Sequence, residues 1–194
     1  MWSRIKRWVH PKYPEAKGEP LGILASTIAY NAAKCLELMD LNLPTETEKE
    51  FAKIDLLLEF TWAFSHIASR YALGFLGPEK ALSFMRDTWI PITSWVFVES
   101  YFKDSPADAK EEARAAFLRG ARARDIEYGE CRDLLIEGEA FSDDAVLFRL
   151  GKRVAEIAGH SYNPATIMMV QSNMVRMLVD SCFNQIVEKA VRGV

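Results

Sequence analysis

The sequence predicts an all-α protein: an elongated helical bundle of five long helices and one short helix. The strongest indication is the segment 45–77, whose apolar residues cover an arc of roughly 220° at the helical period of ~100° per residue. Signals typical of strands are scarce, and most prolines stand at turns or at expected helix starts. We expect a single helical-bundle domain over residues 1–194, since a chain of this length can form one substantial core.

The first residues, 1–19, are expected to form an N-terminal strap and a linker. Residues Trp2 to Val9 can make two helical turns with apolar side chains on one side and basic ones on the other. We favour packing of this basic amphipathic segment on the bundle over binding to a membrane surface, because it is too short to anchor alone. The apolar run 21–33 is interpreted as helix rather than signal peptide, because acidic residues and prolines separate it from the basic start.

Helix start and stop residues divide the first half of the chain. The first long helix is expected over 20–41, where it meets a proline-containing break. Thr45 is a good N-cap for the central helix, which is expected over 45–77 with a glycine as its stop. The third helix is expected over 78–102, with a kink or break at Pro91. A short extended segment after that proline is the alternative.

The second half is expected to hold the remaining helices. These are a fourth long helix over 105–136 with a stop at Gly138, a shorter one over 142–159, and a last one over 163–191. Between residues 165 and 187 the last helix carries only two charges and is apolar on more than one side. We therefore expect the central and last helices to be innermost, and the last helix to form a homodimer interface.

Composition and missing motifs exclude several functions. A net charge of -3 argues against a surface built for nucleic acid. The cysteines Cys35, Cys131 and Cys182 are far apart and odd in number, which favours reduced thiols in a cytoplasmic protein. The longest uncharged run, 157–175, contains Gly, His, Asn and Pro, which is not typical of a membrane span. The HExxH, P-loop, GxGxxG and GxSxG motifs are absent from the sequence.

One candidate site lies on the fourth helix. Arg124 and Glu127 project into its apolar stripe, and charges that face a core are costly unless they are paired, hydrogen-bonded, ligand-bound or neutralised. Arg124 could hold an anionic ligand, while Glu127 with Cys131 one turn on could contribute to a metal or proton-transfer site. We favour the simpler interpretation that Arg124 and Glu127 pair with each other, because they are three residues apart.

A second candidate site lies on the central helix. Its polar stripe contains Asp55, Glu59 and His66, and residues seven apart share a helix face, so Glu59 and His66 could reach one ligand. We favour the simpler interpretation that this stripe faces solvent, because most helices keep one such stripe and this helix has no other. Glu99, embedded in an apolar run, is a further candidate. The Glu-x-x-His pattern of di-iron bundles does not occur, and the identity of any metal or cofactor stays open.

These patterns favour a cytoplasmic, homodimeric helical protein that binds a partner or an apolar small ligand without catalysis. The reason is a surplus of apolar helix faces without a recognisable catalytic set. The alternative is an enzyme that binds a metal or small molecule through Glu127 and Arg124 with Glu59 and His66, where an acid holds a hard cation or acts as a general base. A second alternative is peripheral membrane association through Trp2–Val9.

Overall fold

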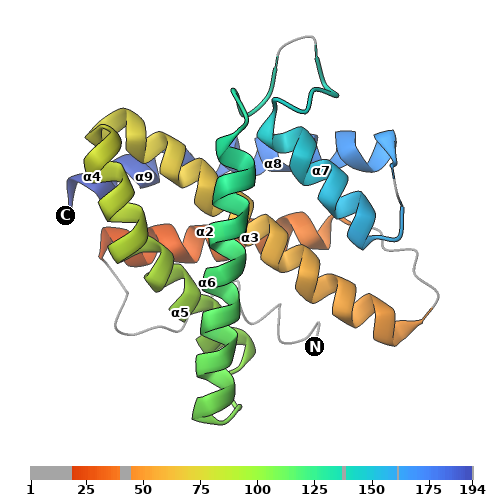
Figure 1. Ribbon diagram of the computed structural model, residues 1–194, viewed down its shortest axis with the longest axis horizontal. Coiled ribbons are helices and arrows are strands. Elements are labelled where there is room, and N and C mark those ends of the chain that lie inside the picture. The colour runs from red at the N-terminus through yellow and green to blue at the C-terminus, as the bar shows by residue number, and fades with distance from the viewer. Residues whose placement is uncertain (1–18, 40–44, 137–138, 161, 194) are drawn as a thin grey trace.

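The computed structural model describes residues 19–39, 45–136, 139–160 and 162–193, without the side chains of residues 87 and 88, so the predicted strap Trp2–Val9 lies outside it. Within these ranges the all-α prediction is confirmed, because helices and turns account for the chain (Figure 1). In chain order the elements are α2 (Pro20–Glu37), α3 (Glu46–Leu76), α4 (Pro78–Phe84), the π-helical η1 (Met85–Trp89), α5 (Ile90–Tyr101), α6 (Ala107–Gly129), α7 (Val146–Ile157), α8 (Pro164–Asp180) and α9 (Phe183–Arg192).

The central helix α3 matches its prediction closely. Thr45 caps it: its hydroxyl accepts from the Glu48 amide at 3.1 Å, and the Glu48 carboxylate accepts from the Thr45 amide at 3.0 Å. Figure 1 shows α3 crossing the molecule from edge to edge, with α6 passing in front of it near the centre. The helix packs against α2, α4, α6, α7 and α9, which explains why its apolar arc is so wide.

The predicted last helix is in fact two helices. α8 ends at Asp180, Cys182 adopts a left-handed backbone conformation with φ 49°, and α9 begins at Phe183, whose ring is buried beside those of Phe64 and Tyr71. The expectation that the last helix is innermost is wrong for α8, because one of its sides stays exposed. The other inner helix is α2, which packs against α3, α5, α8 and α9.

The third predicted helix, 78–102, is helical from Pro78 to Tyr101 but not uniform. The irregularity that Pro91 predicts takes the form of the π-helical turn η1 just before it, so the proline falls in the first turn of α5, where its missing N–H is tolerated. The wider turn is accompanied by complete burial of Trp89. The alternative of an extended segment is wrong, because residues 90–101 are α-helical.

The fourth predicted helix, 105–136, ends early at Gly129, and the next begins at Val146 rather than near 142. The described part of the intervening segment forms turns, with a backbone bridge between its two ends. Carbonyl groups that would continue α6 are instead bound by Arg70 of α3 and Arg149 of α7. Long-range contacts therefore accompany the end of this helix, and the stop expected at Gly138 lies outside the described residues.

The interior is a single large hydrophobic cluster with smaller ones beside it. Its largest fully buried side chains include Trp89, Tyr128 and Phe183. Cys35 and Cys131 are buried in this cluster and Cys182 is exposed, and all three thiols are free. Across the described ranges, no helix combines the length and the apolar character that a membrane crossing requires.

Candidate functional site

Four of the five candidate residues meet where α6 and α7 both pack against α3. We call this cluster the polar junction; it consists of Glu59, His66, Arg70, Arg124, Asp125, Glu127, Tyr128 and Arg153. Glu59, His66 and Arg70 come from one side of α3, and Arg153 comes from α7. The remaining four come from a single turn of α6, which places both predicted candidate sets in one continuous network.

Glu59 is the most deeply buried acid of the polar junction, at 3% exposed. Arg124 Nε donates to its two carboxylate oxygens at 2.9 and 2.8 Å, and Arg124 Nη2 donates to Oε1 as well. The Tyr128 hydroxyl donates to Oε2 at 3.5 Å. Hydrogen bonding to Glu59 raises the pKa of Arg124, and burial raises the pKa of Tyr128. The buried carboxylate is thus matched by a guanidinium and a neutral phenol, as a stable buried charge requires.

Glu127 is shared between two arginines. Arg124 Nη1 donates to it at 3.2 Å, so the pairing favoured from their spacing is present. Arg153 of α7 donates to the same carboxylate through Nε and Nη2, each at 3.3 Å, and this hydrogen bond raises the pKa of Arg153. The Arg124 guanidinium also lies over the ring of Trp62, 5.7 Å from its centroid. Glu127 and Arg124 therefore join α7, α6 and α3.

His66 is oriented through both of its ring nitrogens. Its Nε2 accepts from Arg70 Nε at 2.9 Å, and its Nδ1 lies 2.9 Å from Asp125 Oδ1. Because an arginine N–H can only donate, Nε2 must carry the lone pair, which assigns the proton to Nδ1 and makes it the donor to Asp125. Arg70 then donates to the carbonyls of Tyr128 at 3.0 Å and Arg132 at 3.1 Å, and to that of Cys131. His66 thus positions Arg70, which caps the end of α6.

Glu99, the fifth candidate, lies away from the polar junction. Its carboxylate accepts from Lys110 Nζ at 2.9 Å and from Arg114 Nη2 at 2.7 Å, which ties α5 to the first turns of α6. The hydrogen bond from Lys110 is the main cause that lowers the pKa of Glu99, and the contact with Arg114 lowers it further. Asp55 is exposed on α3, one turn before Glu59. The interpretation of a solvent-exposed stripe is therefore wrong for Glu59 and His66, which are buried.

The predicted combination of Glu127 with Cys131 does not form a ligand set. The Cys131 thiol lies 3.8 Å from the carbonyl oxygen of Asp143, and burial raises its pKa, which favours the neutral thiol. Among the residues that the structure describes, no group of three His, Cys, Asp or Glu side chains is arranged to hold a metal ion. Glu59 and Glu127 meet arginines instead, and Asp125 meets His66, so the arrangement binds helices to one another.

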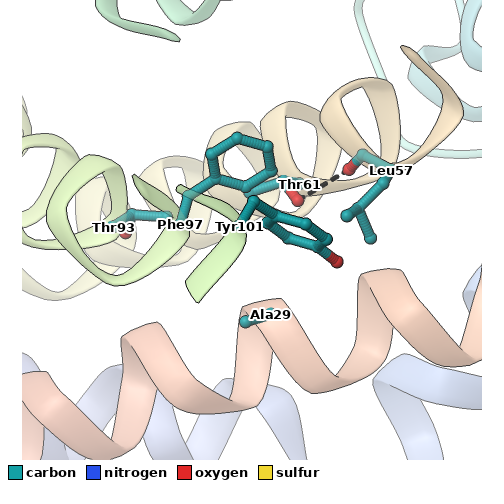
Figure 2. Close-up of a pocket in the computed structure, with 6 residues that line it drawn as sticks. All are labelled: Ala29, Leu57, Thr61, Thr93, Phe97 and Tyr101. Carbon is teal, nitrogen blue, oxygen red and sulfur yellow. Dashed lines mark hydrogen bonds between the residues drawn. The ribbon is translucent and has the colours of Figure 1, made fainter. Parts of the chain in front are cut away.

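A small pocket lies where α2, α3 and α5 meet (Figure 2). It contains ≈ 200 Å³ of unfilled space, part of it open solvent, and is lined by Ala29, Leu57, Thr61, Thr93, Phe97 and Tyr101. The Thr61 hydroxyl donates to the Leu57 carbonyl at 2.7 Å, the dashed line in Figure 2. The Thr93 hydroxyl likewise donates to a backbone carbonyl one turn earlier, that of Trp89, at 3.0 Å. The pocket is apolar, and the enclosed part of it has room for about one water molecule, far less than the ~300–1,000 Å³ of ordinary ligand sites.

The outer face of α8 is the second feature that sequence patterns singled out. We give this name to five exposed residues of α8 that repeat every three or four positions, together with an exposed cysteine in the turn that follows the helix, namely Ala165, Met168, Ser172, Val175, Val179 and Cys182. Val179 is 68% exposed and Met168 53%. The charged residues of α8, Arg176 and Asp180, pair with each other at 3.3 Å beside this face. Comparison with known proteins gives no match, neither to a family model, nor to a curated protein, nor to a solved structure.

Proposed function

We propose that this protein acts by binding rather than by catalysis, and that it forms a homodimer through the outer face of α8. The observation that carries the proposal is the exposure of Met168 and Val179 on a helix whose two charges neutralise each other. Apolar residues three and four positions apart form the stripe that a partner helix covers. A second copy is the partner that this stripe fits, because a two-fold axis pairs the same small and apolar surface with itself and leaves no charge unpaired.

The size of the outer face indicates how strong this association is. Residues 165–182 span about 25 Å at ~1.5 Å per residue, and a helix is about 12 Å wide, so the face offers roughly 300 Å² per copy. A stable interface of standard size buries about 800 Å² per partner. We therefore expect a weak, concentration-dependent dimer in which α8 supplies the centre, and neighbouring elements add the rest.

The alternative of an enzyme or metal site receives less support. A general base needs a carboxylate with a lone pair directed at a substrate, but Glu59 and Glu127 accept from arginines. An apolar ligand in the pocket of Figure 2 is limited to a small group by the unfilled space there. Membrane association through Trp2–Val9 and a cytoplasmic location remain predictions; loss of liposome binding on removal of the first ten or so residues would identify the former.

The test is sedimentation of the full chain over a wide range of concentrations, for wild type, Val179→Glu and Ile126→Glu. Ile126 is the matched control, since it lies on α6 and is 64% exposed, against 68% for Val179. We expect wild type and Ile126→Glu to dimerise with rising concentration, and Val179→Glu to stay monomeric. A wild type that is monomeric throughout, or a Val179→Glu chain that dimerises like wild type, would overturn the proposal. Native mass spectrometry of the same wild-type sample would reveal a bound metal or small molecule and so favour the alternatives.

A further inference from the structure

We infer that the two copies pair with their α8 helices antiparallel, about a two-fold axis that passes between Ser172 and Val175. The inference rests on the proposed function, because it specifies the arrangement of the partner on the outer face of α8. It is argued from the order of side-chain sizes along that face, from the direction of the helix dipole and from the place of the Arg176–Asp180 pair.

The order of side chains along the outer face favours opposite directions. With the axis between Ser172 and Val175, Ser172 meets Val175 of the partner subunit, Met168 meets the partner's Val179, and Ala165 meets the partner's Cys182. Each contact then joins a small or flexible side chain to a branched or larger one. A parallel pair would place every residue against its own copy, with two serines leaving a gap beside two crowded methionines. Even filling is what close packing requires.

Helix electrostatics favour the same direction. α8 is a helix of seventeen residues, long enough to carry a full dipole with its positive end at Pro164. Antiparallel neighbours place the positive end of one helix beside the negative end of the other, whereas parallel neighbours place like ends together. Both ends of the outer face lie within a turn of a helix terminus, where these partial charges are concentrated.

The charged pair beside the face is compatible with antiparallel contact. Arg176 and Asp180 already neutralise each other one turn apart, so covering the face leaves no charge without a partner. Met169 lies on the same flank of α8 as Arg176 and is half-buried. Antiparallel pairing brings the partner's Met169 within about two residues' rise, ~3 Å, of the level of Arg176, where it can cover the aliphatic part of the arginine side chain.

Cys182 makes the direction measurable. It is the exposed cysteine of the chain, whereas Cys35 and Cys131 are buried. Antiparallel pairing separates the two copies of Cys182 by about 25 Å along the helix axis, and parallel pairing places them side by side. A disulfide needs Cα atoms within roughly 7 Å. A cysteine at position 172, close to the two-fold axis, lies near its own copy whether the two helices run antiparallel or parallel.

The experiment is oxidative crosslinking of the full chain with a copper–phenanthroline oxidant, which takes two electrons from each pair of thiols and releases their two protons. Wild type is compared with the double variant Ser172→Cys, Cys182→Ser on a non-reducing gel, and sedimentation of the reduced samples shows that each is folded and dimeric. We expect most of the double variant to shift to twice the monomer mass and wild type to stay at the monomer mass.

Every other outcome contradicts a defined part of the proposal. Crosslinking of wild type, with or without crosslinking of the double variant, would mean that the two copies of Cys182 meet as in a parallel pair, which overturns the direction and leaves the α8 homodimer in place. Crosslinking of neither chain, with dimers seen in sedimentation, would mean that the copies meet elsewhere and would overturn both proposals. Monomers in sedimentation would overturn the homodimer itself.

Discussion

The polar junction and the outer face of α8 both hold residues in environments that are unusual for their type. Charged residues are buried in the junction, and apolar residues are exposed on the α8 face. In the junction, the carboxylates of Glu59 and Glu127 are buried or half-buried, yet each accepts from an arginine of a neighbouring helix or the same one. On α8, Met168 and Val179 are apolar but exposed, and no part of the described chain covers them. Within the described residues, the charged groups of the junction have partners, whereas the apolar side chains of the α8 face do not. An unusual position therefore indicates a binding site only where the chain fails to supply the partner.

The largest effect is expected at the centre of the polar junction. Replacing Glu59 by Gln leaves Arg124 buried without its main carboxylate, and we expect the free energy of unfolding to fall by about 3–5 kcal/mol. Urea denaturation followed by circular dichroism measures it. Replacing Glu59 and Arg124 together by methionine should cost less than Glu59→Gln, because no buried charge is left over.

The opposite result at Glu59 would weaken the contrast between the polar junction and the outer face of α8. If Glu59→Gln kept or raised stability, the acid would not be a structural partner of Arg124, and a ligand-binding role would regain support. The same comparison applied to Glu127→Gln tests the α7 side of the polar junction, where Arg153 and Arg124 share one carboxylate. A smaller loss is expected there, because Glu127 is less buried than Glu59.

The next effect concerns the close approach of α6 to α3. A Cβ atom added at Gly120 would lie 2.2 Å from a ring carbon of Trp62, the side chain under Arg124. Gly120→Ala should therefore lower the free energy of unfolding by about 1–3 kcal/mol, because α6 must shift away from α3. Gly129→Ala on the same helix meets nothing within 4 Å and should not lower stability. Equal thermal midpoints for the two variants would show that the interface is looser than its geometry indicates.

A smaller effect is expected at Glu99, and it should depend on pH. Lys110 and Arg114 lower its pKa in the folded state, so it stabilises the fold above the unfolded-state value of about 4.3, and this contribution disappears as pH falls through the folded value. Glu99→Gln should thus cost up to about 1 kcal/mol at neutral pH and nothing in strongly acidic solution. Urea midpoints at the two pH values check this; a difference that grows on acidification would have the wrong sign.

The smallest effect on stability is expected on the outer face of α8. Val179→Glu should change the free energy of unfolding of the monomer by no more than about 0.5 kcal/mol, because the side chain is exposed. Chemical denaturation at a concentration below dimer formation measures it. A loss above about 1 kcal/mol would mean that Val179 supports the fold of the single chain, and the contrast between the two regions would weaken.

Features that depend on local sequence could be predicted, and those that depend on distant partners could not. The capping box at Thr45 and Glu48 is encoded by residues three apart, and the extent of α3 follows from it and from Gly77. The Arg124–Glu127 contact could be predicted for the same reason, because the two residues are three positions apart. The stronger Glu59–Arg124 pair joins residues that are 65 apart, and helical projection cannot show which stripes face each other.

The break in the predicted last helix and the early end of α6 have the same origin. The sequence around Cys182 contains no glycine or proline, so nothing local indicates the break between α8 and α9. The break is accompanied by burial of Phe183 beside Phe64 and Tyr71. α6 likewise ends where arginines from α3 and α7 bind its carbonyls. The excess of apolar residues in the last helix could be detected from the sequence. Whether those residues face the core or solvent depends on where the helix breaks.

The arginine contacts at the end of α6 imply that this helix does not open evenly. Arg70 and Arg149 bind the carbonyls of Tyr128 and Glu127, so the last turn is fastened to two other helices at once. The first turns, near Ala107, are more exposed and are tied through Glu99. Transient fraying should therefore start near Ala107 and become rarer toward Gly129, and the backbone amides of α6 should exchange their hydrogens more slowly in that order.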